Sequence, residues 1–247
     1  MCIIAYKPKG VKMPTKAVLK TCFNANPDGA GLAIMHPDSN KVVIEKGFMT
    51  FADFWDMAQC YDDIDSDIAY HFRITTSGGT RPENCHPFPV SASVTDITKL
   101  STTAKYAFIH NGVIGKGKGR LSDTMLYVKD VLAHIKDSLS DKRITDKIAK
   151  DTQGSRTILF DAERHKVTMT GKWITDKTGM LFSNNSYVPF DTSYCFDSIE
   201  PCIVCPICGA YDTNFVSEYH NLFECDNCYC LYDGKGEVWA LGESDTF

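Results

Sequence analysis

Short apolar segments, separated by turn-forming residues, run through residues 1–200. These segments are mostly rich in Ile, Val, Phe and Tyr, and are often bounded by Gly, Pro, Asn or Asp, a composition typical of β-strands. The pattern predicts strands at residues 2–6, 31–35, 41–45, 68–74, 106–109, 156–160 and 166–170.

Two longer segments favour helices. Residues 51–61 follow Thr50, a residue type that commonly caps the N-terminus of a helix. Residues 123–139 follow Ser122, and apolar positions recur through them at mostly helical spacing. These positions are Leu126, Val128, Val131, Leu132 and Ile135. A third, shorter helix is predicted to begin after Pro14.

The order of these elements predicts the fold class. Strands predominate early and late, helices lie between them, and the two do not alternate regularly. An α+β fold, in which helices cover an antiparallel sheet sandwich, fits this order better than a doubly wound parallel sheet.

The composition changes toward the C-terminus. Six of the eleven cysteines lie within residues 202–230, and residues 202–247 contain eight Asp or Glu and a single base, Lys235. We therefore predict one large domain at 1–200 and a second, small domain at 201–247. A tight cysteine cluster indicates a metal site, whereas a disulfide framework would spread its pairs along a secreted chain.

Charge and hydropathy argue against several other classes of protein. The formal net charge is −5, and a nucleic-acid binder would usually carry a basic face. No apolar run approaches the roughly 18 residues that span a bilayer, and the N-terminus lacks the pattern of a signal peptide. We expect a cytoplasmic protein without membrane contact.

Cys2 directly follows the initiator methionine and is a candidate nucleophile. Removal of Met1 would leave Cys2 with a thiol and a free α-amine, whose reference pKa of about 7.7–8.0 suits a general base near neutrality. One residue would then supply both nucleophile and base. Taken alone, this position fits a buried strand cysteine better than a nucleophile.

Two further segments carry groups that acyl transfer needs. Asn111 and Gly112 follow an apolar strand, where a side-chain amide and a backbone N–H could face one oxyanion. The same Asn-Gly pair is also a strong hairpin-turn signal. Arg73 lies within an apolar strand, and a buried arginine needs a partner, ideally a carboxylate, either structural or from a ligand.

Seven short motifs occur in order along residues 1–184. They read Met-Cys-Ile-Ile at the start, Asn-Pro-Asp-Gly-Ala-Gly-Leu-Ala at 26–33, His-x-Arg-x-x-Thr-x-Gly at 71–78, Asn-x-His-Pro at 84–87, His-Asn-Gly at 110–112, Ser-Asp-Thr at 122–124 and Phe-Ser-Asn at 182–184. In this order, with cysteine at position 2, they resemble the class II glutamine amidotransferases, which belong to the N-terminal-nucleophile hydrolases.

The resemblance implies a four-layer αββα fold and a reaction. Cys2 would attack the side-chain amide of glutamine, and Asn111 and Gly112 would form the oxyanion hole. Collapse of the tetrahedral oxyanion would release ammonia and leave a γ-glutamyl thioester. Water would then hydrolyse the thioester to glutamate.

The resemblance also implies how glutamine is bound. Arg73 would hold its α-carboxylate and Asp123 its α-ammonium group, while Thr76 and His86 lie in motif positions that line the glutamine pocket. A zwitterion is well served by one fixed cation and one fixed anion, and arginine offers a planar fork for a carboxylate. Asp123 would start a helix, which helps to keep it ionised; without the other motifs, a simple N-terminal helix acid is the preferred interpretation.

The sequence departs from the family pattern in three ways. The usual ammonia-acceptor domain is missing, a basic glycine loop at 115–120 follows the His-Asn-Gly motif, and Ser77 stands where an aromatic residue or histidine is more usual. We expect a separate synthetase or nucleotide-modifying partner to accept the ammonia. Two alternatives stay open: an amidohydrolase of another γ-glutamyl amide, and a catalytically silent binding or adaptor module.

The C-terminal cysteines predict a zinc ribbon. Cys205-Pro-Ile-Cys208-Gly has the form of a zinc knuckle, and Cys225-Asp-Asn-Cys228 follows after sixteen intervening residues. Two such pairs can hold one structural Zn²⁺ with four thiolates, which leave no open position for catalysis. A unit of about 45 residues has a small core, so metal binding would contribute much of its folding energy.

The ligand register of this ribbon is open. Cys202 and Cys205 form an alternative first pair, Cys230 could replace Cys228, and His220 is a weaker candidate ligand. Zinc ribbons often bind nucleic acid, but the acidic composition of this segment would repel phosphate. We therefore expect a stabilising or protein-docking role and no direct contact of the ribbon with nucleic acid.

Overall fold

The computed structural model describes residues 2–139, 141–188, 205–207, 213–217, 222–225, 230–233 and 238–240. The chain divides into two compact units, residues 1–189 and 190–247, which are described separately. The predicted boundary between residues 200 and 201 lies outside the described residues.

Antiparallel pairing joins the described strands of the larger unit into two sheets. The seven-stranded sheet has the order β10-β11-β1-β4-β2-β3-β6, and the four-stranded sheet has the order β5-β7-β8-β9. The strands are β1 (Ile3–Lys7), β2 (Ala30–Met35), β3 (Val42–Phe48), β4 (Ile68–Phe72), β5 (Phe88–Pro89), β6 (Ser101–Ala104), β7 (Tyr106–Asn111), β8 (Arg156–Asp161), β9 (Lys166–Thr170), β10 (Ile174–Thr175) and β11 (Leu181–Phe182).

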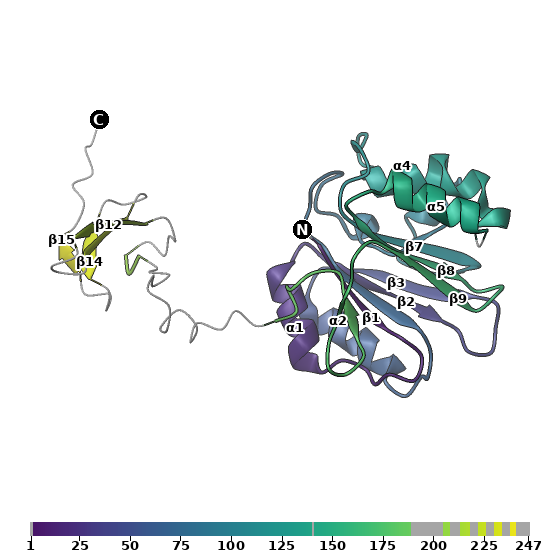
Figure 1. Cartoon of the computed structure of the whole chain (residues 1–247), viewed down its shortest axis with the longest axis horizontal. Coiled ribbons are helices and arrows are strands. Elements are labelled where there is room, and N and C mark those ends of the chain that lie inside the picture. The colour runs from purple at the N-terminus through teal and green to yellow at the C-terminus, as the bar shows by residue number, and fades with distance from the viewer. Residues whose placement is uncertain are drawn as a thin grey trace. The chain divides into compact units, whose positions relative to one another are not determined.

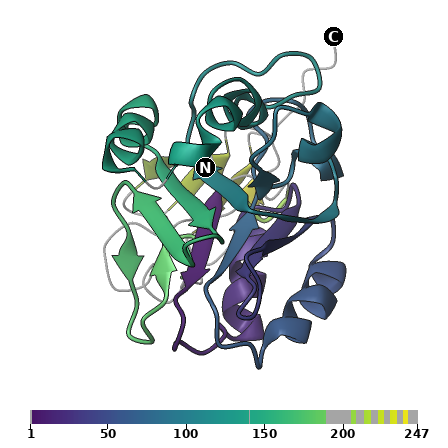
Figure 2. The ribbon, with the colours of Figure 1, turned by 90° about the vertical axis from the view of Figure 1, so that its right-hand side faces the viewer.

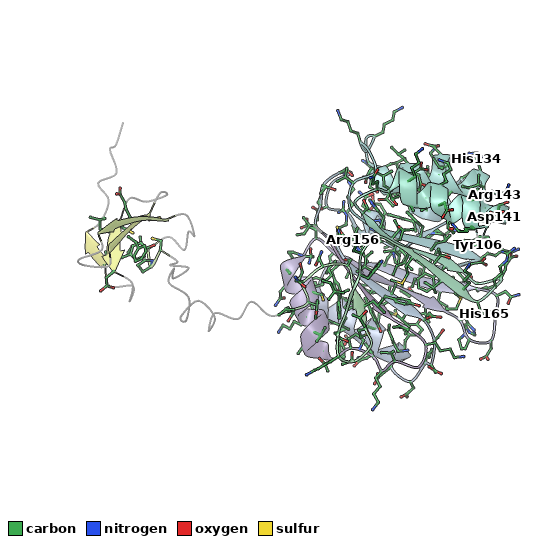
Figure 3. All side chains as sticks on the ribbon, in the orientation of Figure 1. Tyr106, His134, Asp141, Arg143, Arg156 and His165 are labelled. Atoms are coloured by element: carbon green, nitrogen blue, oxygen red, sulfur yellow. The ribbon has the colours of Figure 1, made fainter. Side chains whose placement is uncertain are left out.

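Side-chain caps begin the helices of the larger unit. The Thr50 and Ser122 side chains accept backbone N–H groups from the first turns of the helices that follow them, as predicted, and Asp141 accepts from the N–H of Arg143 (Figure 3). The helices are α1 (Lys16–Ala25), α2 (Phe51–Ala58), α3 (Val94–Ile97), α4 (Asp123–Asp130) and α5 (Lys142–Asp151), with short 3₁₀ helices at Gln59–Tyr61, Pro82–Asn84, Leu132–His134 and Lys136–Ser138.

The helix predicted at residues 123–139 was wrong in its length. It ends at Asp130, and Val131 has φ −120° and ψ −65°, away from helical values. Two 3₁₀ helices follow, and Leu132 and Ile135 still pack in the same apolar cluster as Val128 of α4. Four of the five apolar positions that predicted this helix therefore pack in this cluster, and Leu126 lies outside it. Spacing does not distinguish one long helix from a short helix continued by tighter turns.

The layers of helices and sheets in the larger unit can be followed in Figures 1 and 2, and three clusters of apolar side chains lie between them. Phe54 of α2 packs in the cluster between the helices α1 and α2 and the seven-stranded sheet. Ile4 and Ile109 pack in the cluster between the two sheets. Phe108 and Val128 pack in the cluster between the four-stranded sheet and α4 and α5. The unit is therefore a mixed α/β structure with antiparallel sheets, as expected.

Alternation along the strands assigns side chains to these layers. Ile3 and Ala5 of β1 face the cluster that α1 and α2 cover, whereas Ile4 and Tyr6 face the other sheet. This period of two is the geometry of a strand whose two faces are both buried.

The smaller unit contains an antiparallel sheet with the order β12-β13-β14-β15. Its strands are β12 (Thr213–Ser217), β13 (Leu222–Cys225), β14 (Leu231–Asp233) and β15 (Val238–Ala240). A buried cluster lies on this sheet and consists of Cys205, Phe223, Cys225, Cys230 and Tyr232.

None of the helices that the structure describes combines the length and the apolar character that a bilayer crossing requires.

Candidate functional site

Cys2 lies immediately before β1 and is partly exposed. Its Sγ contacts the backbone of Ile74, accepting from the N–H at 3.3 Å and donating to the carbonyl at 3.4 Å. The Asn184 side chain donates to the Cys2 carbonyl at 2.7 Å. Burial raises the pKa of the Cys2 thiol, against the opposing effects of the Ile74 backbone and the charge of Arg73. The thiol therefore needs a proton acceptor if it is to attack as a thiolate.

Asn111 ends β7 and is connected to β1 through Ser183. Its Nδ2 donates to Ser183 Oγ at 2.8 Å, and the same oxygen accepts the N–H of Ile4 at 2.9 Å. Gly112 follows with φ +154°, and a Cβ at this position would lie 2.0 Å from Ser155 Oγ. Glycine is thus required here, because any side chain would collide with Ser155.

Arg73 extends from the end of β4 and is 4% exposed. Its Nη1 donates to Thr75 Oγ1 at 2.8 Å and to the Gly79 carbonyl at 3.0 Å, and its Nη2 donates to the Ser77 carbonyl at 2.8 Å. Three of the five guanidinium N–H groups are used in this way, which leaves two donors. No ion pair within the described part of the chain includes Arg73.

Asp123 is the first residue of α4 and is 8% exposed. Its Oδ2 accepts the N–H of Ile114 at 3.0 Å, and its Oδ1 accepts the N–H of Thr124 at 2.9 Å. Among the described residues it too forms no ion pair.

Ser77 connects these two buried charges. Its carbonyl accepts from Arg73, while its Oγ donates to Asp123 Oδ1 at 3.3 Å and accepts the Asp123 N–H at 3.4 Å. A cation and an anion therefore lie on either side of one residue, without a direct ion pair between them. An α-amino acid, which carries both charges on one carbon, is the ligand that this arrangement fits chemically.

Asn84 supports the loop that contains Ser77. Its Nδ2 donates to the carbonyls of Gly78 and Gly79, at 2.7 Å and 3.2 Å. A Cβ at Gly78, which has φ +74°, would lie 2.8 Å from that nitrogen. The close approach of Asn84 therefore depends on a glycine in the loop.

Three buried histidines lie near these groups. The ring centroids of His71 and His86 are 4.3 Å apart, and His110 Nδ1 is 3.0 Å from Thr124 Oγ1. Burial lowers the pKa of His71 to about 3, that of His110 to about 4, and that of His86 well below its ordinary value. All three are therefore neutral near pH 7.

The structure brings some of the predicted site residues together through shared neighbours and leaves others apart from them. Arg73 and Asp123 share a bridging residue, and Cys2 and Asn111 contact the neighbouring residues Asn184 and Ser183. Two other predicted residues do not share these contacts. Thr76 is exposed, and His86 is buried against the rings of His71 and Phe88. Sequence reasoning noted the motifs that contain Asn84, Ser183 and Asn184 but gave them no role, and it treated Ser77 only as a departure from a pattern.

Two of the four predicted metal ligands are described. Cys205 and Cys225 are buried in one cluster with Cys230, and Cys205 Sγ lies 3.2 Å from Cys230 Sγ. Cys208 and Cys228 lie outside the described residues. The described contacts thus bring Cys230, the alternative ligand, next to Cys205.

Comparison of the chain with models of known protein families and with curated proteins found no match.

Proposed function

We propose that the larger unit is an N-terminal-nucleophile amidohydrolase of the class II glutamine amidotransferase type, which releases ammonia from glutamine. The observation that carries this proposal is the pair of buried charges, Arg73 and Asp123, on either side of Ser77. The order of layers, with helices outside two stacked antiparallel sheets, supports the αββα sandwich of that class. The ammonia would pass to a separate synthetase or nucleotide-modifying partner.

Arg73 and Asp123 would recognise the head group of glutamine with hydrogen-bonding capacity that their protein contacts leave unused. The two remaining N–H donors of Arg73 can form a bidentate pair with the α-carboxylate. Asp123 can accept the α-ammonium group, since carboxylate oxygens accept more than one hydrogen bond. With the head group held at both charges, the side-chain amide is free to extend toward Cys2.

The reaction requires that Met1 be removed, so that Cys2 gains a free α-amine. The amine takes the thiol proton, the thiolate attacks the amide carbon, and the oxyanion is held by Asn111 and the N–H of Gly112. The α-ammonium group of Cys2 passes its proton to the amide nitrogen, and ammonia leaves as the tetrahedral intermediate collapses. Water then cleaves the γ-glutamyl thioester to glutamate and the free Cys2 thiol. Because burial raises the thiol pKa, an adjacent base is needed for this first step.

The proposal is tested by measuring ammonia and glutamate released from glutamine by purified protein. We expect turnover by the wild type and its loss in Cys2→Ala, with Cys60→Ala, which changes an exposed cysteine outside this site, retaining full activity. The intact mass should show that Met1 is absent. Retention of Met1, or equal ammonia release by Cys2→Ala, would contradict the mechanism, and turnover of only another γ-glutamyl amide would change the substrate.

We also propose that the smaller unit holds one structural Zn²⁺. Two thiolates bound to one zinc ion at about 2.3 Å lie at most about 4.6 Å apart, and the Cys205 and Cys230 sulfurs fall within that limit. Cys205 and Cys230 therefore fit as two of the ligands, and Cys208 and Cys225 would complete the four, although the described residues by themselves form no group of three possible metal ligands. This ligand set contains Cys230, whereas the set predicted from the sequence contains Cys228. Measuring the metal content of two variants distinguishes them: we expect Cys230→Ser to lose zinc and Cys228→Ser to retain it.

A further inference from the structure

Ser77 contributes to both halves of the head-group site with different atoms. Its carbonyl accepts from Arg73, a contact that any side chain at position 77 would preserve. Its hydroxyl contacts Asp123, and it is the one side-chain group within the described residues that donates to that carboxylate; the other donors to Asp123 are the backbone N–H groups of Ile114 and Thr124. The hydroxyl can therefore be removed without changing the Arg73 contact.

Gly117 lies close to the Ser77 side chain. A Cβ placed on Gly117 would lie 3.1 Å from Ser77 Cβ and 2.7 Å from the Leu121 carbonyl. Gly117 therefore approaches Ser77 closely, and the Lys118 N–H and carbonyl pair with those of Leu121 to close this loop. A larger residue at position 77 would push the loop away from the site.

We propose that Ser77 is a positioning residue that determines specificity for amides carrying an α-ammonium group. Its hydroxyl fixes the Asp123 carboxylate for the ammonium group, while its carbonyl fixes Arg73 for the α-carboxylate. The two charges of the substrate are thus recognised as a pair at a set separation. This inference rests on the proposed function and adds a residue to it.

The test compares glutamine with 4-carbamoylbutanoate, the same amide without its α-amine. In Ser77→Ala we expect KM for glutamine to rise about tenfold, the size expected for loss of a hydrogen bond to a charged group, with kcat changed less than about twofold. The kcat/KM for 4-carbamoylbutanoate should stay within about twofold of the wild type, because that substrate makes no use of Asp123. The preference for glutamine therefore falls about tenfold.

Ser101→Ala is the matched control, because Ser101 also donates to a carboxylate, that of Glu45, at 2.8 Å on an exposed strand. We expect it to leave both substrates unchanged. Equal losses on both substrates in Ser77→Ala, or no loss on either, would overturn the inference. Absence of wild-type turnover of glutamine would instead overturn the proposed function, and the inference with it.

A double-mutant cycle and a binding measurement exclude a merely structural effect. Asp123→Asn should remove the preference for glutamine, and adding Ser77→Ala to it should change that preference no further. Calorimetry with glutamate and with glutarate, which lacks the ammonium group, should show the same loss of selectivity in Ser77→Ala. Additive effects in the cycle, or unchanged selectivity in calorimetry, would contradict the role of Ser77.

Discussion

The two units of the chain bury different kinds of side chain. The clusters of the larger unit consist mainly of aliphatic and aromatic groups such as Ile4, Phe54 and Phe108. In the part of the smaller unit that the structure describes, three of the five residues of the buried cluster are cysteines, and the other two are Phe223 and Tyr232. Apolar burial can stabilise the first, but a core as small as the second requires a cross-link, which the proposed zinc ion would supply.

Removal of zinc should give the largest difference between the units. A strong chelator, or Cys225→Ser, should unfold the smaller unit, because metal binding of about 10–16 kcal/mol is coupled to folding in such modules. Hydrogen exchange measured by mass spectrometry should show lost protection in peptides from residues 213–240 and unchanged protection in β1 and β7. Full protection of both units in the chelated protein would contradict the proposal that the smaller unit depends on zinc for its folding.

Acid should destabilise the larger unit through its buried histidines. His71 and His110 have pKa values of about 3 and about 4 in the folded protein, against an ordinary value of 6.5. Below pH 6.5 the unfolded chain therefore binds more protons than the folded one. For each of these histidines, the free energy of unfolding falls by about 1.4 kcal/mol for every unit by which the pH is lowered. This loss continues until the folded pKa is reached.

Urea unfolding of the larger unit at pH 7, 6 and 5 measures this effect. A free energy of unfolding that stays constant from pH 6.5 to pH 5 would show that the buried histidines are not neutral.

A core substitution should act on the larger unit alone. Phe54 is fully buried, and its ring centroid lies 5.0 Å from that of Phe72. Phe54→Ala should reduce the free energy of unfolding by about 3–5 kcal/mol while zinc content stays at the wild-type level. Val113→Ala, at a 64% exposed position, serves as the control and should change stability by less than about 0.5 kcal/mol. Loss of zinc in Phe54→Ala would mean that the two units do not fold independently.

Much of the fold of the larger unit could be predicted from the sequence. The predicted strand at 106–109 lies within β7, and Thr50 and Ser122 cap helices as expected. Short strands such as β5 and β6 were missed, because two to four residues give too few alternating positions for a periodic signal.

The candidate site was less predictable than the fold. Arg73 and Asp123 could be paired from the charge of an amino acid and from ordered motifs, but Ser77 could not be given a role. Its contacts depend on how the loop after β4 approaches the start of α4, 46 positions away in the sequence. Cys230 was only an alternative zinc ligand, because spacing alone does not determine which of two nearby cysteines faces Cys205.

The hydrogen bond from Asn184 to the Cys2 carbonyl joins groups 182 positions apart. A contact of such sequence separation cannot form on the ribosome before the second partner has been synthesised. Cys2, the proposed nucleophile, therefore leaves the ribosome early, while the segment that contacts it follows only after most of the chain. If Met1 is removed as proposed, the aminopeptidase can act during synthesis before Asn184 is in place, which is the order that the proposed chemistry requires.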